Sequence, residues 1–364
     1  MAYFDHNATA PVSSEVVDAV TNALKTYGNP SSVHAEGRIA RAAVEMARED
    51  VAQLVGAKPE NVIFTSGATE ANNQALSGCG RTQVLASAIE HPSVLEVVPR
   101  DNRISVSSDG ITDLDALSDM LKQRGPSVVV SVMAANNESG IIQPVKPSAE
   151  IAHAAGALFH CDAVQALGRI PFDMELLGAD MATISAHKIG GPKGVGALIL
   201  ADGIGIDRFI HGGGQERRHR GGTENVAGIA GFGVAAKKAA ERRIKICRIA
   251  NLIKLLERRA FAAVPEAVVF GEEVPRIANT SLIALPGVDA ETQIMALDLA
   301  GVYVSAGSAC SSGKVAESHV LQAMGVDNAV SRCAIRISLG FENTLEEVDK
   351  FIEVWSSLAK RRGT

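Results

Sequence analysis

The chain has 364 residues and a formal net charge of −6 at pH 7, from 35 Lys and Arg against 41 Asp and Glu. This balance argues against binding to nucleic acid or to an anionic membrane surface. No run reaches the roughly 18 apolar residues of a membrane-spanning helix, and the N-terminus lacks the basic start and apolar run of a signal peptide. We therefore expect a cytoplasmic enzyme with one large and one smaller domain.

The first two thirds of the chain alternates helical patterns with short apolar runs. A first helix is expected over about 14–27 and a second over 36–55, with Ile39, Ala43, Met46 and Leu54 on one face. Apolar runs of strand length follow at 61–66, 84–88, 128–134, 157–161, 181–185 and 196–200. Such runs, separated by helical patterns, are typical of an α/β fold with a mostly parallel sheet.

The order of elements changes after a long helix expected over about 224–250. Strands are expected at 267–271, 280–285, 302–305 and 334–338, and helices at 290–300 and 344–358. This pattern predicts a separate, smaller α+β domain. We place the large domain at 13–245 and the small domain at 1–12 and 246–364, with the first dozen residues packed back against it.

Polar side chains follow several of the expected strands. They are Thr69 after 61–66, His91 after 84–88, Asn137 after 128–134, Asp162 and Gln165 after 157–161, and Ser185, His187 and Lys188 after 181–185. Taken singly, each has an ordinary interpretation as a helix cap or a core polar group. Together they lie where open α/β sheets bind ligands.

These residue types match the needs of pyridoxal phosphate. Gly67, Ala68 and Thr69 at a helix N-terminus offer N–H groups and a hydroxyl to a phosphate. An Asp can hold a protonated ring nitrogen, and a Lys can form a Schiff base. The set therefore indicates a pyridoxal-phosphate enzyme.

Several segments strengthen this interpretation. The pair Asp162-Ala-Val-Gln165 and Ser185-Ala-His-Lys188 resembles the cofactor core of the class V aminotransferase superfamily. The further segments YFDHNATAPV, GNPSSVHAEGR, NNESG, HRGGTENVAG and SAGSACSSG resemble the group I cysteine desulfurases, whose examples are the nitrogen-fixation and iron–sulfur-cluster enzymes. Matching segments run from about Phe4 to Gly340. The resemblance implies the fold type I of pyridoxal-phosphate-dependent transferases.

The resemblance also implies a role for each candidate residue. Lys188 would carry the cofactor and move the substrate Cα proton, and Asp162 would pair with the ring nitrogen. His91 would stack on the ring, while Gln165 and Asn137 would bond around its phenolic oxygen. Phosphate binding would fall to Ala68, Thr69, Ser185 and His187.

Substrate binding and assembly follow from the same resemblance. Arg336 would grip the substrate carboxylate with help from Asn7 and Asn137, with Arg332 as a weaker candidate. Thr223 would reach the phosphate in the neighbouring subunit, which implies a homodimer with shared active sites. Arg217, Arg218 and Arg220 nearby are read as a solvated loop or a dimer contact rather than a nucleic-acid patch.

Cys310 decides the reaction that the resemblance implies. It stands among small residues without apolar periodicity, a composition typical of an exposed, mobile loop. There it would take sulfur from L-cysteine as a persulfide, leave L-alanine, and pass the sulfur to an acceptor such as an iron–sulfur scaffold protein. Through that persulfide it could also act as a transient iron–sulfur ligand. The other four cysteines lie in or beside expected elements and are read as structural.

Other functions stay open at this point. A selenocysteine lyase or a plain class V aminotransferase would use the same cofactor residues, although an aminotransferase has no use for Cys310. A non-catalytic sulfur-handling protein would not need Lys188, Asp162 and His91 together. Gly-rich stretches such as GGPKGVG are weak evidence for a dehydrogenase, because none follows a strand as G-x-G-x-x-G. The sequence also leaves open whether the acceptor serves nitrogenase or general cluster assembly.

Overall fold

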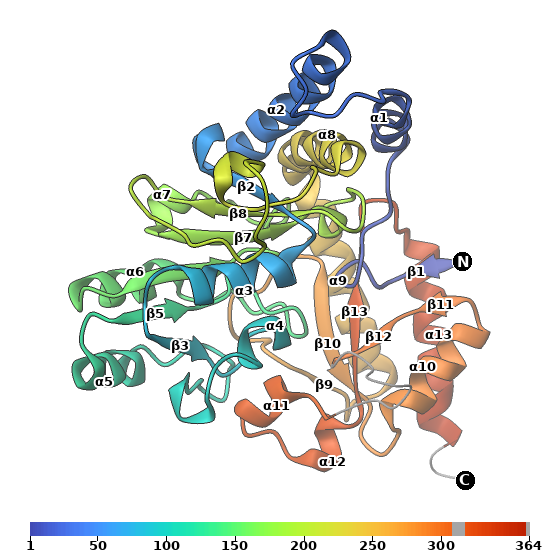
Figure 1. Ribbon diagram of the computed structural model, residues 1–364. Coiled ribbons are helices and arrows are strands. Elements are labelled where there is room, and N and C mark those ends of the chain that lie inside the picture. Colours follow the sequence, from blue (N-terminus) through green and yellow to red (C-terminus); the bar gives the residue numbers. More distant parts are fainter. Residues whose placement is uncertain (308–316, 362–364) are drawn as a thin grey trace.

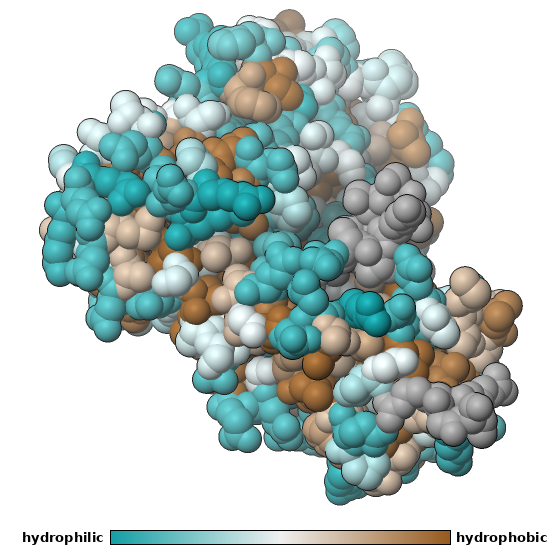
Figure 2. Space-filling view, turned by 90° about the horizontal axis from the view of Figure 1, so that it is seen from below, coloured by the Kyte–Doolittle hydropathy of each residue, from teal (hydrophilic) through white to brown (hydrophobic). Residues whose placement is uncertain are grey.

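The computed structural model describes residues 1–307 and 317–361. Its main feature is a seven-stranded sheet with helices around it, beside a smaller four-stranded sheet (Figure 1). None of the described helices is long and apolar enough to cross a membrane. Figure 2 shows hydrophilic residues over much of the face seen from below, with hydrophobic residues in separate groups between them.

The seven-stranded sheet has the order β2-β8-β7-β6-β5-β3-β4. Strand β8 is antiparallel to both its neighbours, and the remaining pairs are parallel. This confirms the expected α/β fold with a mostly parallel sheet. The strands are β2 (Val62–Thr65), β3 (Gln83–Ser87), β4 (Arg103–Ile104), β5 (Val128–Ser131), β6 (Leu158–Asp162), β7 (Met181–Ser185) and β8 (Gly196–Leu200).

Helices cover this sheet on both sides and connect its strands. They are α1 (Ser14–Lys25), α2 (Ala35–Val55), α3 (Ala68–Gly78), α4 (Pro92–Leu95), α5 (Leu114–Arg124), α6 (Val145–Ala154), α7 (Met174–Leu177) and α8 (Val226–Arg242). Helices α1, α2 and α8 lie together at one end of the sheet, beyond β2 (Figure 1).

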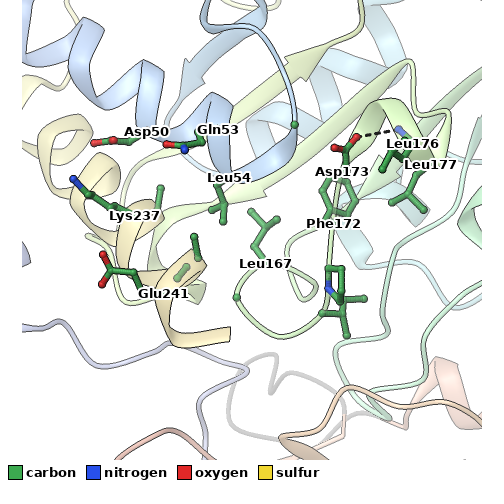
Figure 3. Close-up of a pocket in the computed structure, with 17 residues that line it drawn as sticks. Asp50, Gln53, Leu54, Leu167, Phe172, Asp173, Leu176, Leu177, Lys237 and Glu241 are labelled. Carbon is green, nitrogen blue, oxygen red and sulfur yellow. Dashed lines mark hydrogen bonds between the residues drawn. The ribbon is translucent and has the colours of Figure 1, made fainter. Parts of the chain in front are cut away.

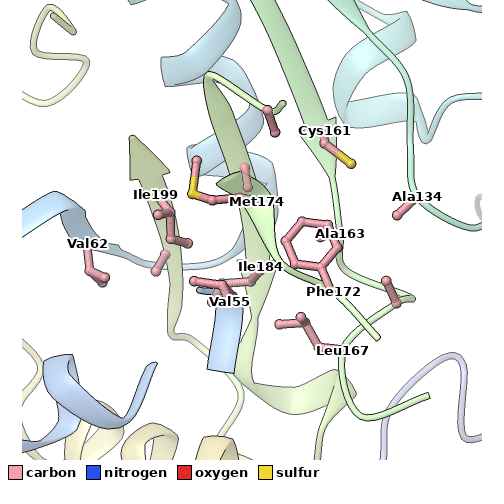
Figure 4. Packing of buried hydrophobic residues seen from close by; sticks show 14 of the residues in the cluster. Val55, Val62, Ala134, Cys161, Ala163, Leu167, Phe172, Met174, Ile184 and Ile199 are labelled. Carbon is pink, nitrogen blue, oxygen red and sulfur yellow. The ribbon is translucent and has the colours of Figure 1, made fainter. Parts of the chain in front are cut away.

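The core explains why the central strands were recognisable as apolar runs. Strands β5, β7 and β8 are buried at every position, so both faces of the sheet select apolar side chains. Figure 4 shows part of this core, in which Ile184 and Ile199 of adjacent strands lie near Val55 of α2 and Phe172.

The expected apolar face of α2 is wrong for two of its four residues, while Ala43 is half-buried and Leu54 packs against the core. Ile39 and Met46 are 53% and 61% exposed, whereas Ala40, Val44, Ala47 and Val51 form the buried face. The reason is close packing against α8, because a Cβ at Gly233 would lie 2.6 Å from the Cα of Ala47. A small residue, Ala47, therefore stands where α8 approaches most closely, and a larger side chain would not fit there.

The smaller sheet has the order β12-β13-β10-β9 and is antiparallel. The N-terminus lies beside this part, since β1 pairs in parallel with β11 and Phe4 is buried against Phe351. Where the domain boundary falls stays a prediction. The elements are β1 (Ala2–Tyr3), α9 (Ile246–Ala263), β9 (Val268–Val269), β10 (Thr280–Ala284), α10 (Ala290–Leu299), β11 (Val302–Tyr303), β12 (Ser305–Ala306), α11 (His319–Ala323), α12 (Asn328–Ser331), β13 (Ala334–Ser338) and α13 (Leu345–Arg361).

Two expected elements differ from the structure. The helix expected over 224–250 is two helices, α8 and α9, separated by a 3-10 turn at Arg243–Lys245. No Gly or Pro marks this break, which occurs where packing changes from α2 to α13. The strand expected over 302–305 is two short strands, β11 and β12, in different sheets.

Candidate active site

A cavity of about 800 Å³ brings most of the expected site residues together. Its walls come from the turns after β2, β3, β5, β6 and β7, from the N-terminal segment, and from β12 and β13. The expected residues that line it are Asn7, Ala68, Thr69, His91, Asn137, Asp162, Gln165, Ser185, His187, Lys188 and Arg336. The cavity therefore lies at the carboxyl ends of parallel strands.

A second cavity, of about 640 Å³, lies between α2, α8 and residues 167–177 (Figure 3). Aliphatic side chains such as Leu54 and Leu167 line it, with Lys237 and Glu241 of α8 to one side. It contains none of the expected site residues. We therefore place the site in the larger cavity.

The amine of Lys188 is prepared to act as a base near neutral pH. It follows β7, and its Nζ donates to the backbone oxygens of Asn7 at 2.6 Å and Ala8 at 3.1 Å. Burial lowers the pKa of Lys188 to about 8, and the guanidinium groups of Arg336 and Arg169 act in the same direction. Among the described residues no carboxylate bonds this amine, so none of its hydrogen bonds opposes the lowered pKa.

Asp162 and His91 are joined through a residue that the sequence did not single out. Asn72 on α3 is fully buried, and its Nδ2 donates to Asp162 Oδ2 at 2.9 Å and to Ser93 Oγ at 2.8 Å. The Ser93 hydroxyl in turn contacts His91 Nδ1 at 2.8 Å. The N–H of Val164 bonds the other Asp162 oxygen at 3.0 Å. Asn72 therefore sets the orientation of both residues.

Burial and nearby charged groups shift the pKa of His91. Burial lowers the pKa of His91, Asp162 opposes this effect, and Lys188 and His319 add to it. Its Nδ1 also accepts from the Ser93 N–H at 3.1 Å, which favours a neutral ring with Nδ1 as acceptor.

The N-terminus of α3 forms one end of the cavity. Its N-cap, Gly67, supplies no side-chain hydrogen bond to the first turn, so the N–H groups there are available to an anion. Glu70 is held back by its ion pair with Arg220, at 2.9 Å, and by the Ser66 N–H. This arrangement fits a phosphate group.

Ser185 and His187 line the same cavity. Burial lowers the pKa of His187 to about 4, with Lys188 and Lys193 adding to the effect. His187 is therefore a neutral hydrogen-bonding group, and its Nδ1 lies 3.3 Å from Thr9 Oγ1.

Arg336 on β13 brings a buried cation to the cavity. Its Nη2 donates to Asp5 Oδ1 at 2.7 Å and its Nη1 to the Asn137 backbone oxygen at 3.1 Å. Its Nε has no hydrogen-bond partner among the described residues. The guanidinium is thus fixed in place and still has an N–H group, at Nε, that can donate to a bound carboxylate.

The amides of Asn7 and Gln165 already have partners. Asn7 Nδ2 donates to Thr280 Oγ1 at 2.9 Å, and its Oδ1 accepts from Asn279 at 3.2 Å. Gln165 Nε2 donates to the Asn7 backbone oxygen at 3.1 Å, and its Oε1 accepts from Arg169. Their expected contacts with substrate and cofactor stay predictions.

Two expected residues are not placed in the cavity. Thr223 is exposed and is not among the lining residues. Cys310, with its expected loop and its expected role as a transient iron–sulfur ligand, lies outside the described residues. Within the described ranges, no group of three or more His, Cys, Asp or Glu could hold a metal ion. Of the other cysteines, Cys247 is exposed, and Cys79, Cys161 and Cys333 are buried.

Two of the three arginines near Thr223 are tied to neighbouring elements. Arg220 pairs with Glu70, and Arg217 pairs with Glu45 at 3.3 Å. The Glu216 beside them is buried and accepts from Arg48 at 2.7 and 3.0 Å.

The sequence analysis missed three residues that shape the cavity. Asn72 holds Asp162, Arg169 lies against Gln165 and Lys188, and Glu138 is buried beside Arg336. Only Glu138 had a visible signal, since it lies within the NNESG segment. The other two depend on contacts between distant segments.

The cavity fits pyridoxal phosphate, the cofactor that the sequence resemblance implies. The uncapped α3 N-terminus suits its phosphate, and the doubly held Asp162 suits its ring nitrogen. The buried Asn137 Oδ1 also has no partner among the described residues and so awaits a donor.

Comparison with known proteins bears on this arrangement. Residues 2–351 match the family model described as aminotransferase class-V. A cysteine desulfurase of Sinorhizobium fredii (strain NBRC 101917 / NGR234) is 42% identical, with the alignment covering 99% of this chain and 96% of that protein. The cysteine desulfurase IscS of Methanosarcina thermophila is 36% identical over 99% of this chain and 92% of its own.

A solved structure agrees at the level of the fold. The NifS-like protein from Rickettsia africae ESF-5 has a TM-score of 0.92 and 36% sequence identity, and 99% of each chain is covered. The similarity therefore extends over both sheets.

Proposed function

Because the chain belongs to the aminotransferase class-V family, and within it to the cysteine desulfurases, we propose that it is a cysteine desulfurase. It converts L-cysteine to L-alanine and takes up the sulfur as a persulfide on Cys310. The observation that carries this proposal is that Ser305, five residues before Cys310 in the chain, lines the same cavity as Lys188 and Asp162.

Enzymes of this family depend on pyridoxal phosphate. When bound, it supplies an electron sink that stabilises negative charge at the substrate Cα and weakens the bond from Cβ to sulfur. Lys188 would bind the carbonyl carbon of the cofactor, and Asp162 would pair with its ring nitrogen. Ala68, Thr69, Ser185 and His187 would bind its phosphate, and His91, Gln165 and Asn137 its ring.

Lys188 would remove the Cα proton and keep it at Nζ for return. This requires the neutral amine, and a pKa of about 8 provides it in useful amount at physiological pH. The backbone oxygens of Asn7 and Ala8 accept from Nζ and would keep the protonated amine in place.

Arg336 would bind the substrate carboxylate. Asp5 and the Asn137 backbone oxygen fix its guanidinium, so little ordering is needed on binding. The Cys310 thiolate would then attack the substrate sulfur. A sulfur–sulfur bond forms, the Cβ–sulfur bond breaks with its electron pair left on carbon, and the carbon skeleton takes up protons and leaves as L-alanine.

The finer assignments extend this proposal. The acceptor is an iron–sulfur cluster scaffold protein in the cytoplasm, in general assembly or in service of nitrogenase. In a homodimer, the exposed Thr223 would reach the partner's cofactor phosphate, and Cys310 would be a transient iron–sulfur ligand. These assignments rest on the sequence resemblance.

The test is product analysis on the purified enzyme loaded with pyridoxal phosphate. With L-cysteine, the wild-type protein should release L-alanine and carry a persulfide on Cys310, detected by mass spectrometry. Cys310→Ala should keep the cofactor spectrum and lose alanine formation by at least ~10³-fold, because the activated thiolate opens the easier route. Near wild-type release by Cys310→Ala would instead indicate a β-eliminating or selenocysteine lyase.

A further inference from the structure

Glu138 is a buried acid that the mechanism above does not use. Its side chain is 2% exposed in the turn after β5, directly after the cavity residue Asn137. Asn136 Oδ1 accepts from the N–H groups of Glu138 and Ser139, both at 2.9 Å, and fixes this turn. Burying a carboxylate is costly, so its contacts are informative.

Glu138 contacts described residues on either side of 308–316, the range that contains Cys310. On the C-terminal side, Ser318 Oγ donates to Glu138 Oε2 at 2.5 Å. On the N-terminal side, the backbone of Gly307 passes so close that a Cβ placed there would lie 2.9 Å from the same oxygen. One carboxylate oxygen thus bonds Ser318 and lies beside the backbone of Gly307.

His319 extends these contacts to the ring-stacking residue. Its Nε2 lies 2.9 Å from the Glu90 backbone oxygen, and its Nδ1 lies 3.9 Å from Glu138 Oε1. Glu90 directly precedes His91 in the chain. The residues after 308–316 are therefore tied to the two turns that carry His91 and Asn137.

The charges around Glu138 favour these contacts. Burial raises the pKa of Glu138, while His319, the Ser318 hydroxyl and Arg336 oppose this effect by stabilising the carboxylate. Hydrogen bonds to a carboxylate are about twice as strong as neutral ones. Replacing the carboxylate by an amide of the same shape therefore weakens the contacts without opening a cavity.

We propose that Glu138 is a positioning residue for the sulfur-transfer step, because it bonds Ser318 and lies against the backbone of Gly307, beside the turns that carry His91 and Asn137. This inference rests on the proposed function. Substrate binding and removal of the Cα proton use Arg336 and Lys188, neither of which makes a hydrogen bond to Glu138 among the described residues. Attack on the substrate sulfur requires the Glu138 contacts, since effective reaction needs the two sulfur atoms held within near-contact geometry.

The experiment separates the two halves of the reaction in Glu138→Gln, with the cofactor bound. Mixing with L-cysteine should still change the absorbance spectrum, at an apparent Kd within about three-fold of wild type. The rates of persulfide formation on Cys310 and of alanine formation should fall at least ten-fold. Gly307→Ala is the second variant, because its methyl group would press on Glu138 Oε2. It should likewise leave the spectral change with L-cysteine in place and slow the formation of persulfide and alanine.

Glu317→Gln is the matched control. Glu317 is an exposed acid next to Ser318 and bonds Gln322 at 2.7 Å, so its loss should leave both rates unchanged. Wild-type persulfide rates in Glu138→Gln would overturn the proposal. So would a parallel fall of the spectral change, both rates and the melting temperature, which a purely structural role would cause. A wild-type enzyme that forms neither product would instead overturn the proposed function on which this role depends.

Discussion

Replacing Asn72 with Leu should reduce cofactor binding and turnover without a matching loss of stability. The substitution keeps a buried side chain of similar size on α3 and removes the donor that reaches Asp162 Oδ2 and Ser93 Oγ. Asp162 would keep only the Val164 N–H among these donors, and His91 would lose the residue that anchors Ser93.

The magnitude follows from the lost hydrogen bonds. A bond to a charged acceptor contributes about 1.5–3 kcal/mol and a neutral one about 1 kcal/mol. If the free energy of the hydrogen bond to the Asp162 carboxylate is lost from the transition state, kcat/KM should fall by roughly 10- to 100-fold, because 1.36 kcal/mol corresponds to a factor of ten in rate. The Asn72 Oδ1 is buried without a partner among the described residues, so its removal offsets part of the cost. We expect the net stability change to stay within about 1 kcal/mol.

The assay has three parts: titration of the apo-protein with pyridoxal phosphate, the rate of alanine formation, and thermal unfolding. Asn73→Leu is the control, because the Asn73 amide donates to the backbone oxygens of Thr69 and Ser93 instead of to Asp162. Cofactor affinity and kcat/KM within two-fold of wild type in Asn72→Leu would show that the Asn72 amide does not hold Asp162 in place for catalysis.

Three further outcomes are expected. Arg169→Met removes a cation that lowers the pKa of Lys188, so this pKa should rise. Because the base is the neutral amine, the acidic limb of the pH profile of kcat should move to higher pH by on the order of one unit. An acidic limb at the wild-type pH would contradict this expectation. Glu216→Gln removes the buried one of the two carboxylates that pair with Arg48, the other being Glu45, and should cost on the order of 3 kcal/mol. The melting temperature should fall by several degrees, and a melting temperature within one degree of wild type would be inconsistent with a strong buried pair. Mixing Lys188→Ala and Thr223→Ala chains should restore part of the activity if sites are shared, and no recovery despite subunit exchange would rule out sharing.

The central sheet could be predicted from the sequence because its strands are buried on both faces. The runs 181–185 and 196–200 match β7 and β8 at both ends. The face of α2 could not be predicted, because which side is buried depends on how closely α8 approaches through Gly233. The break between α8 and α9 also depends on their different packing partners.

The candidate site likewise contains residues that the sequence predicts and residues that it does not. Asp162 ends β6, and Lys188 and His91 come shortly after β7 and β3, so strand prediction also locates them. Asn72 lies one turn inside a helix, and only the approach of β6 to α3 makes it a partner of Asp162. Such residues act through contacts that no local pattern records.

The role of Lys188 can be tested through the covalent attachment of the cofactor. Among the residues that the structure describes, two lysines, Lys188 and Lys193, line the cavity. Borohydride reduction of the purified holoenzyme, followed by peptide mapping, should place the pyridoxyl group on Lys188 alone. Attachment to Lys193, or no attachment at all, would contradict the account.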